Sequence, residues 1–299
     1  MKGLAEYVLR GRFQALFVTV IGACSMLFCW VSAAVVALVI LRKGPAQGGW
    51  LLMWALLPAG ALLLVYGDSG PLAMLIGTAV LALVLRSTVS LPLTVLTSVA
   101  VGAASGLALI VFAGQFLDQI VVFFAQFLAN LEQQLAANSN DAVVLARPTA
   151  TQVAGILGTA NAVTSVLCLL LARWWQAALF NPGGFGEEFR DLFLPPAATA
   201  LLLIVALALA AMGVQYRAWS MICLVPLSFA GLALIHARAA WRGQGRGLLT
   251  GFYVVWLIID PVKLLVVLAA IADSWFNFRQ RWVHQSDTDT SSSEDDDRG

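Results

Sequence analysis

The feature that most constrains the fold is a series of long apolar runs, each rich in Leu, Ala and Val. Eight runs can be traced, at about residues 13–41, 47–66, 71–86, 89–113, 149–174, 195–213, 218–236 and 248–275. Hydrophobic residues make up 61% of the 299 residues, more than a soluble domain of this size could bury, so lipid must surround most of the chain. Only helices or closed barrels cross a bilayer, and the runs lack the two-residue alternation of barrel strands. The sequence therefore predicts an all-α, polytopic helical membrane bundle.

The first run, residues 13–41, is longer than an ordinary span. One helix of this length would extend about 43 Å, whereas two halves would each extend only about 20 Å. A hairpin that turns near Cys29-Trp30 places eleven Lys and Arg residues on the cytoplasmic side and five outside, whereas an unsplit run gives eight and eight. We therefore favour a short helical hairpin and eight to nine transmembrane segments. Arg279 and Arg281 count against this orientation, because it leaves the C-terminus outside.

Charge divides the chain into a membrane body and a tail. We expect a single integral-membrane helical domain over residues 1–281 and a disordered acidic tail over residues 282–299. The last fourteen residues carry six acidic side chains against one basic side chain, and such polar acidic segments do not fold. The Lys and Arg residues of the body stand at the ends of apolar runs, which is typical of a membrane surface. The lipid bilayer is thus the expected partner, and nucleic acid is not.

No motif in the chain predicts catalysis. The four cysteines all lie in apolar runs without a CxxC pair or a nearby His, which is typical of small buried side chains. Walker sequences, zinc-ligand spacings and paired catalytic acids are absent from the sequence. We expect no enzymatic activity, no cofactor and no metal site.

Two opposite charges interrupt the last apolar run. Asp260 and Lys263 stand about midway along residues 248–275, where each charge costs on the order of 3 kcal/mol. A spacing of three places them on one helix face, so we expect an ion pair, and Pro261 weakens the backbone hydrogen bonding between them. Arg86, which ends the short third run, can face the same interior or serve as a cytoplasmic anchor. These three residues form a candidate intramembrane polar site, for helix packing or for a ligand or proton.

Two connections are longer than turns. Residues 115–135 place their polar side chains in one helical sector and their Phe, Leu and Ile side chains in the other, which predicts an amphipathic helix. This helix either lies in the membrane interface or extends the fourth run. In residues 174–193, a tryptophan pair typical of a membrane interface precedes a helix break and a short acidic, aromatic turn. This second connection is a candidate surface for a membrane or cytoplasmic protein partner, through Trp174, Trp175, Asn181, Gly184, Glu187, Glu188 and Arg190.

The C-terminal exit Asp273-Ser-Trp-Phe-Asn-Phe-Arg279 is similar to the signature Asp-x-x-Phe-(Asp/Asn)-Phe-Arg of the YybS-like (DUF2232) bacterial membrane proteins. The segment Asn181-Pro-Gly-Gly-Phe-Gly-Glu-Glu-Phe-Arg190 and the turn Leu41-Arg-Lys-Gly44 also resemble that family. The resemblance implies a multi-pass protein of the bacterial inner membrane without an assigned reaction. It also implies an exit motif of Asp273, Trp275, Phe276, Phe278 and Arg279.

In that motif, the resemblance implies that Asp273 and Arg279 lock the exit turn, although a spacing of six places them on different faces of a continuing helix. The family's hydrophobic pattern resembles the substrate-binding subunits of energy-coupling-factor vitamin transporters, which implies capture of a small molecule. This chain departs from those subunits in having more than six expected spans.

Two functions follow as hypotheses. The first is a permease-like or transporter-subunit-like bundle that binds or moves a small solute, with a cavity lined by Asp260, Lys263 and discontinuous helix ends. The second is a non-transporting membrane scaffold that recruits a partner through residues 174–193, with Asp260 and Lys263 paired to each other in a dry bundle.

Overall fold

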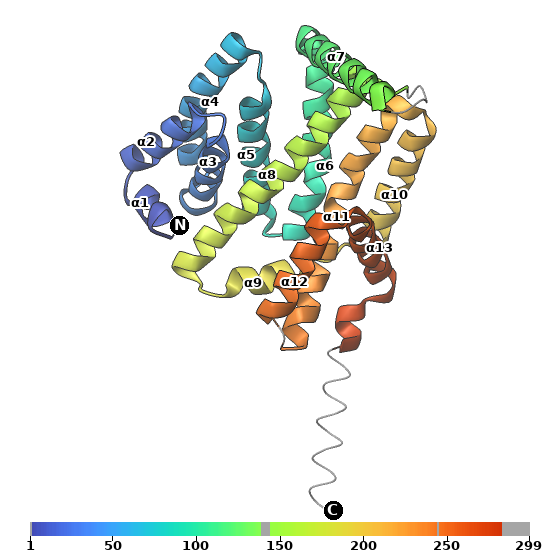
Figure 1. The fold of residues 1–299 in the computed structure, drawn as a ribbon. Coiled ribbons are helices and arrows are strands. Elements are labelled where there is room, and N and C mark those ends of the chain that lie inside the picture. The colour runs from blue at the N-terminus through green and yellow to red at the C-terminus, as the bar shows by residue number, and fades with distance from the viewer. Residues whose placement is uncertain (1, 139–143, 244, 283–299) are drawn as a thin grey trace, which may run out of the picture. The chain divides into compact units, whose positions relative to one another are not determined.

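The computed structural model describes residues 2–138, 144–243 and 245–282 (Figure 1). The acidic tail expected over residues 282–299 lies outside the described residues, apart from its first residue. Within the described ranges the chain is helical and contains no strand. The first part of the chain forms α1 (Lys2–Arg10), α2 (Arg12–Ala23), α3 (Cys29–Lys43), α4 (Pro45–Tyr66), α5 (Gly70–Thr88), α6 (Leu91–Phe112), α7 (Gly114–Asn138) and α8 (Ala150–Phe180). The second part forms α9 (Gly184–Arg190), α10 (Pro196–Ala211), the 3-10 turn η1 (Val214–Tyr216), α11 (Arg217–Trp241), α12 (Gly245–Ile258) and α13 (Asp260–Phe276).

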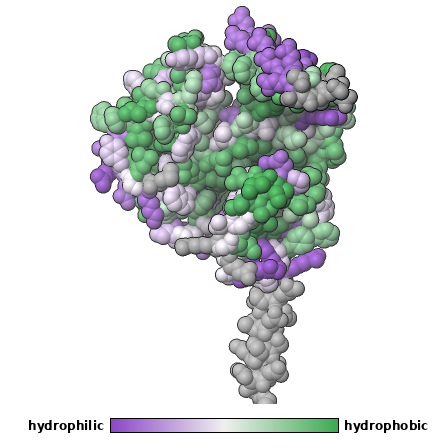
Figure 2. Space-filling view, in the orientation of Figure 1, coloured by the Kyte–Doolittle hydropathy of each residue, from purple (hydrophilic) through white to green (hydrophobic). Residues whose placement is uncertain are grey.

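Five of the described helical segments are long and apolar enough to cross a membrane: Pro45–Tyr66, Gly70–Thr88, Leu91–Phe112, Ala150–Phe180 and Val214–Trp241. A sixth span is added if the bent pair Gly247–Ile258 and Asp260–Phe276 counts as one. Apolar residues cover much of the visible surface (Figure 2), as expected where lipid and not water is the solvent. The helical, membrane-compatible class is therefore confirmed.

The chain divides into two compact units where we expected one domain. Unit 1 contains Met1–Phe185 and Ile204–Val225, and unit 2 contains Gly186–Leu203 and Pro226–Gly299. The last boundary along the chain falls at Pro226, which lies inside α11. A proline inside a helix removes one backbone hydrogen bond, so this point is a natural place for the packing to change.

The hairpin expected in the first apolar run is present in unit 1. The run is split between α2 and α3 by a turn at residues 24–28, just before the predicted point. The hydroxyl of Ser32 donates a hydrogen bond to the carbonyl of Thr19 at 2.6 Å, which joins the two helices close to the turn. Gly22 allows this approach, because a Cβ atom there would lie 2.4 Å from the Ser32 hydroxyl oxygen.

The core of unit 1 lies where α3, α5, α6 and α8 pack against one another. Most of α3 is buried, and α8 contributes a long buried face. Helices α6 and α8 cross at Gly102 and Gly158, where a Cβ atom on Gly102 would lie 2.8 Å from the Gly158 carbonyl oxygen. This close packing of helix backbones through small residues is typical of membrane proteins.

The amphipathic helix expected at residues 115–135 is confirmed as α7. It follows α6 after Ala113, whose backbone leaves the helical region. Leu117 is buried against α6 and α8, whereas Phe123 and Phe127 are exposed. The exposed phenylalanines fit the first of the two expected placements, a helix that lies in the membrane interface.

Unit 2 is built around the second half of α11 and the second half of α13. A Cβ atom on Gly231 would lie 2.2 Å from the Val266 carbonyl oxygen, so only glycine lets these two helices approach so closely. Helix α13 buries its later residues, among them Val266, Val267, Ala270 and Asp273. Its first turns and most of α12 are exposed.

Candidate functional site

The last apolar run is broken and not continuous. Helix α12 ends at Ile258, Ile259 is extended with φ −109° and ψ 99°, and α13 begins at Asp260. The two helices are bent by 118°. Pro261 has no N–H group, so the carbonyl of Leu257 has no helical donor at this break. A polar backbone site therefore lies at the middle of an apolar segment.

The expected ion pair forms at this break, but it is not buried. The Nζ atom of Lys263 lies 2.6 Å from Oδ1 of Asp260, and the Lys263 amine lies 5.8 Å from the centre of the Trp256 ring. The side chain of Asp260 is 86% exposed and that of Lys263 is 46% exposed. The expectation of a buried pair is therefore not met. Its premise was a continuous helix, whereas Asp260 starts a new one, where a carboxylate favours the positive end of the helix dipole. The cavity expected beside these side chains stays a prediction.

Arg86 has a separate position in unit 1. Its Nη1 atom donates to the carbonyl oxygens of Ile40 at 3.0 Å and Leu41 at 2.6 Å, at the last turn of α3. The last carbonyls of a helix lack intrahelical donors, so the guanidinium caps α3. Arg86 thus serves to cap a helix, and its hydrogen bonds go to α3 and not to Asp260 or Lys263. The role of a cytoplasmic anchor stays a prediction.

The exit motif forms a locked turn at the end of α13. Asn277 takes a left-handed conformation with φ 45° and ends the helix. Asp273 then accepts a hydrogen bond from the Phe278 N–H at 3.0 Å and an ion pair from Nε of Arg279 at 3.1 Å. The helix therefore does not continue through the motif. The left-handed residue overrides the spacing of six and brings Arg279 back to Asp273.

The Asp273–Arg279 pair is buried and ties several segments of unit 2 together. The side chains are 4% and 15% exposed, respectively. Arg279 also donates to the carbonyl of Arg190 in α9 and to that of Ala230 in α11. Burial lowers the pKa of Arg279, and the Asp273 carboxylate opposes that shift. The locking role that the resemblance implied for these two residues fits this geometry.

The other residues of the exit motif lie on the outside of this turn. Trp275 and Phe276 are exposed, and the Phe276 ring stacks on Phe278 at a centroid distance of 6.0 Å. On the inner side, the Ser274 hydroxyl bonds to the Leu194 carbonyl at 2.8 Å and to the Thr199 hydroxyl at 2.9 Å. The turn thus has a buried polar side and an exposed aromatic side.

The candidate partner segment is divided between the two units. In unit 1, Trp175 is fully buried and Trp174 is partly exposed, and α8 ends at Phe180 with Asn181 as its cap, as predicted. Gly184 begins α9 and belongs to unit 1. The other three candidate residues, Glu187, Glu188 and Arg190, also lie in α9 but belong to unit 2. A buried Trp175 packs in the core, so only Trp174 of the pair fits the expected membrane-interface position.

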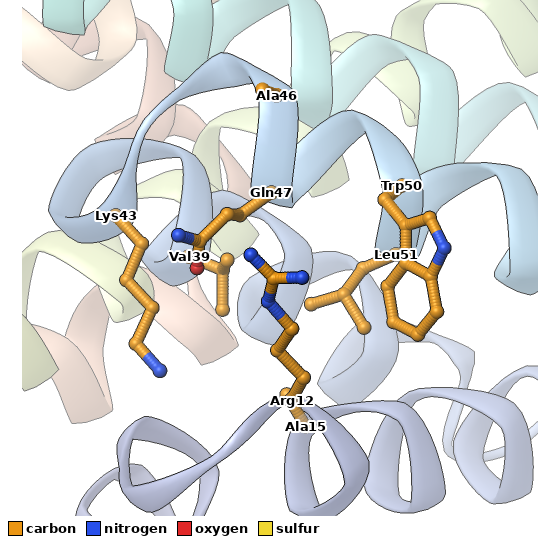
Figure 3. A pocket seen from close by; sticks show the side chains of 8 residues that line it. All are labelled: Arg12, Ala15, Val39, Lys43, Ala46, Gln47, Trp50 and Leu51. Carbon is orange, nitrogen blue, oxygen red and sulfur yellow. The ribbon is translucent and has the colours of Figure 1, made fainter.

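Sequence reasoning missed a cationic cavity in unit 1. It lies between α2, α3 and α4, has a volume of about 180 Å³ and is lined by Arg12, Lys43, Gln47 and Trp50 among others (Figure 3). In the sequence, Arg12 and Lys43 indicate only on which side of the membrane the ends of the first apolar run lie. The expected hairpin was the one signal for this cavity. When residues 13–41 fold into two antiparallel helices, Arg12 before the run and Lys43 after it come to the same end of the hairpin.

Metal ligation has no candidate in the described part of the chain, where no group of three or more His, Cys, Asp or Glu side chains gathers.

Comparisons with protein-family models, curated proteins and solved structures give no match to this chain.

Proposed function

We propose that this chain is a multi-pass protein of the bacterial inner membrane that binds or moves a small polar solute, with the bent pair α12–α13 as its working element. The observation that carries the proposal is the break at Ile259 inside an apolar segment, with a bend of 118° and two charged side chains beside it. The exit motif's resemblance to the YybS-like family supports the bacterial inner membrane.

The physical argument begins with the backbone. Lipid supplies no hydrogen-bond partners, so an interrupted helix is tolerated at membrane depth only where protein or a water-filled cavity satisfies its polar groups. Asp260 and Lys263 are subject to the same limit, because charges in an apolar segment face a cavity or the bundle interior. Membrane transporters use such discontinuous helices to present helix ends and charges to a solute. An exposed break therefore fits a pair of helices that closes over a solute.

Eight to nine membrane segments belong to this proposal. The short apolar helices α2 and α10 fail the length criterion for a full span. The hairpin of α2 and α3 can be counted as one further segment and α10 as another, tilted or partial, segment. Added to the spans named above, they bring the number of membrane segments towards the number expected from the sequence.

The test is a thermal-unfolding screen of the purified full-length protein against vitamins, nucleobases and lipid carriers. A solute that binds only the folded state raises the unfolding midpoint with its concentration. We expect at least one compound to do so, and we expect Asp260→Asn and Lys263→Gln to abolish the shift without lowering the yield of folded protein. Glu6→Gln, which removes an exposed charge from α1, is the matched control. A screen without a binder, or full binding by both break variants, would refute the proposal.

One observation favours the alternative of a non-transporting scaffold. Asp260 and Lys263 pair with each other at 2.6 Å, as that hypothesis requires, although the pair is exposed and not enclosed in a dry bundle. In that case the single substitutions reduce folding, and the double substitution Asp260→Asn/Lys263→Gln restores it. The scaffold also requires a partner at residues 174–193, so affinity isolation should lose a specific protein when Glu187 and Arg190 are substituted.

A further inference from the structure

The cavity of unit 1 carries an inference that does not depend on the proposed solute. Three helices meet around it: α2 supplies Arg12, α3 supplies Lys43, and α4 supplies Gln47 and Trp50. Gly44, with φ 107°, makes the tight turn from α3 into α4. Figure 3 shows the Arg12 guanidinium reaching from α2 towards Gln47, while Lys43 extends from the end of α3.

The two cations at this cavity are available to a ligand. Within the part of the chain that the structure describes, neither Arg12 nor Lys43 has an ion pair or a hydrogen bond, and no carboxylate lines the cavity. Neighbouring arginines are already engaged, because Arg86 caps α3 and Arg42 lies 3.8 Å from the centre of the Phe180 ring. Two unpaired cations with an amide beside them form a site for an anion with several acceptor oxygens.

The cavity has room for such a group. Its volume of about 180 Å³ is more than ten times the roughly 15 Å³ that a single water molecule needs. Arg12 and Trp50 are exposed, so the cavity is reached from the outside of the unit. A planar guanidinium and an ammonium group are both side-chain groups that bind phosphate oxygens.

The surroundings indicate a membrane-interface position. Trp50 packs edge-on against Trp54 at a centroid distance of 6.2 Å, and tryptophans concentrate at the level of lipid headgroups. Helices α2 and α4 both begin at the cavity and run away from it, with exposed apolar side chains along their length. These are Phe13 and Phe17 on α2 and Met53 and Leu57 on α4. At 1.5 Å per residue, Leu57 lies about 15 Å along α4 from Gln47, and Phe17 lies about 8 Å along α2 from Arg12. These apolar side chains offer a path suited to an acyl chain.

We propose that the cavity bounded by α2, α3 and α4 binds a phosphate group, and that the apolar track beside it selects an anionic phospholipid as the source. Arg12 and Lys43 supply the charge, Gln47 donates its amide hydrogens, and Trp50 borders the glycerol region. A soluble phosphate compound shares the same recognition chemistry but would leave the track unused.

The experiment uses the purified full-length protein in a neutral detergent and measures its thermal-unfolding midpoint. Phosphatidylglycerol, phosphatidylcholine and inorganic phosphate are titrated separately, and an apparent Kd is taken from each midpoint shift. The test variant is Arg12→Gln/Lys43→Gln. The matched control, Lys2→Gln/Arg10→Gln, removes two exposed charges from the neighbouring α1.

We expect phosphatidylglycerol to bind more tightly than phosphatidylcholine. A basic residue near an anionic membrane surface contributes on the order of 1 kcal/mol, so losing both should weaken the apparent Kd about 30-fold. The control should keep the wild-type response. If inorganic phosphate matches phosphatidylglycerol, the phosphate site stands and its source is soluble. If no phosphate-bearing probe binds, or the control weakens as much as the test variant, the proposal fails.

A second variant covers the case in which the double substitution does not fold. Ala46 lines the cavity and is exposed, so Ala46→Phe fills the space while keeping both charges. Loss of phosphatidylglycerol binding in Ala46→Phe supports a shaped site, whereas unchanged binding would show diffuse surface attraction and overturn the proposal.

Discussion

Removing the charge of Arg279 should destabilise unit 2 strongly. The substitution Arg279→Met keeps an apolar stem of similar length but leaves the Asp273 carboxylate, whose side chain is 4% exposed, without a cation and with backbone N–H groups of Phe278 and Arg279 as its polar partners. At 3.1 Å and an effective dielectric constant of about 20, the lost attraction is about 5 kcal/mol. Breaking other buried pairs by removing one partner costs about 3–5 kcal/mol. We therefore expect a loss of about 3–5 kcal/mol.

The assay is reversible unfolding of the purified protein in mixed micelles with increasing SDS, followed by tryptophan fluorescence. The matched control is Arg281→Met, because Arg281 is an exposed arginine two residues away, and its loss should change stability by less than about 0.5 kcal/mol. The double substitution Asp273→Leu/Arg279→Met removes the unpaired charge, so it should recover much of the stability that Arg279→Met loses.

Two results would refute this reasoning. A loss of less than about 1 kcal/mol in Arg279→Met would show that the pair and its two carbonyl contacts contribute little. A double variant that is less stable than Arg279→Met would show that Asp273 stabilises the turn by itself, through its bond to the Phe278 N–H.

Three further predictions use the same assay. Gly102→Ala should lower the free energy of unfolding by about 1–3 kcal/mol, because its Cβ would lie 2.8 Å from the Gly158 carbonyl oxygen. The control Gly60→Ala has open space around the new Cβ and should raise the free energy of unfolding by up to about 1 kcal/mol. Equal effects of the two substitutions would contradict the α6–α8 packing. Arg86→Met should lose about 1 kcal/mol, because the last carbonyls of α3 lose their cap, and an unchanged stability would count against that role. Val89→Gly should gain about 1 kcal/mol, because Val89 is exposed at φ 51°, a conformation that β-branched residues avoid, and a loss would show that its side chain has a packing role.

Patterns that depend on composition and chain punctuation could be predicted from the sequence. Apolar content predicted the helical class, and charge counting predicted the hairpin of α2 and α3. The segment Asn181-Pro-Gly-Gly predicted the end of α8, because such residues end helices whatever surrounds them. These features are local, and tertiary packing did not overrule them.

The break at Ile259 could not be located in the same way. Ile259 is the last of a series of apolar residues before Asp260, and Pro261 is equally compatible with a kink and with the first turn of a new helix. The hydropathy of the run is the same for a kinked helix and for two separate helices. It therefore could not predict that Asp260 begins a new helix and is exposed. The locked exit turn had a weak signal in Asn277, because asparagine tolerates the left-handed region that ends a helix. No single helix carried a signal for the cationic cavity, since Arg12 and Lys43 line the same cavity only after the hairpin forms.

The two ends of α13 have opposite mechanical roles. Its last turns are held by Asp273 and Ser274, through bonds to Arg279, Leu194 and Thr199, and by the Gly231 contact at Val266. Its first turn has no comparable bond to the rest of unit 2 among the described contacts of Asp260 and Lys263, which pair with each other. Segments with few buried contacts open at the lowest free energy. Any movement of the break should therefore turn about the fixed end of α13, while the hydrogen bond between His236 and Tyr253 at 2.9 Å holds α12 to α11.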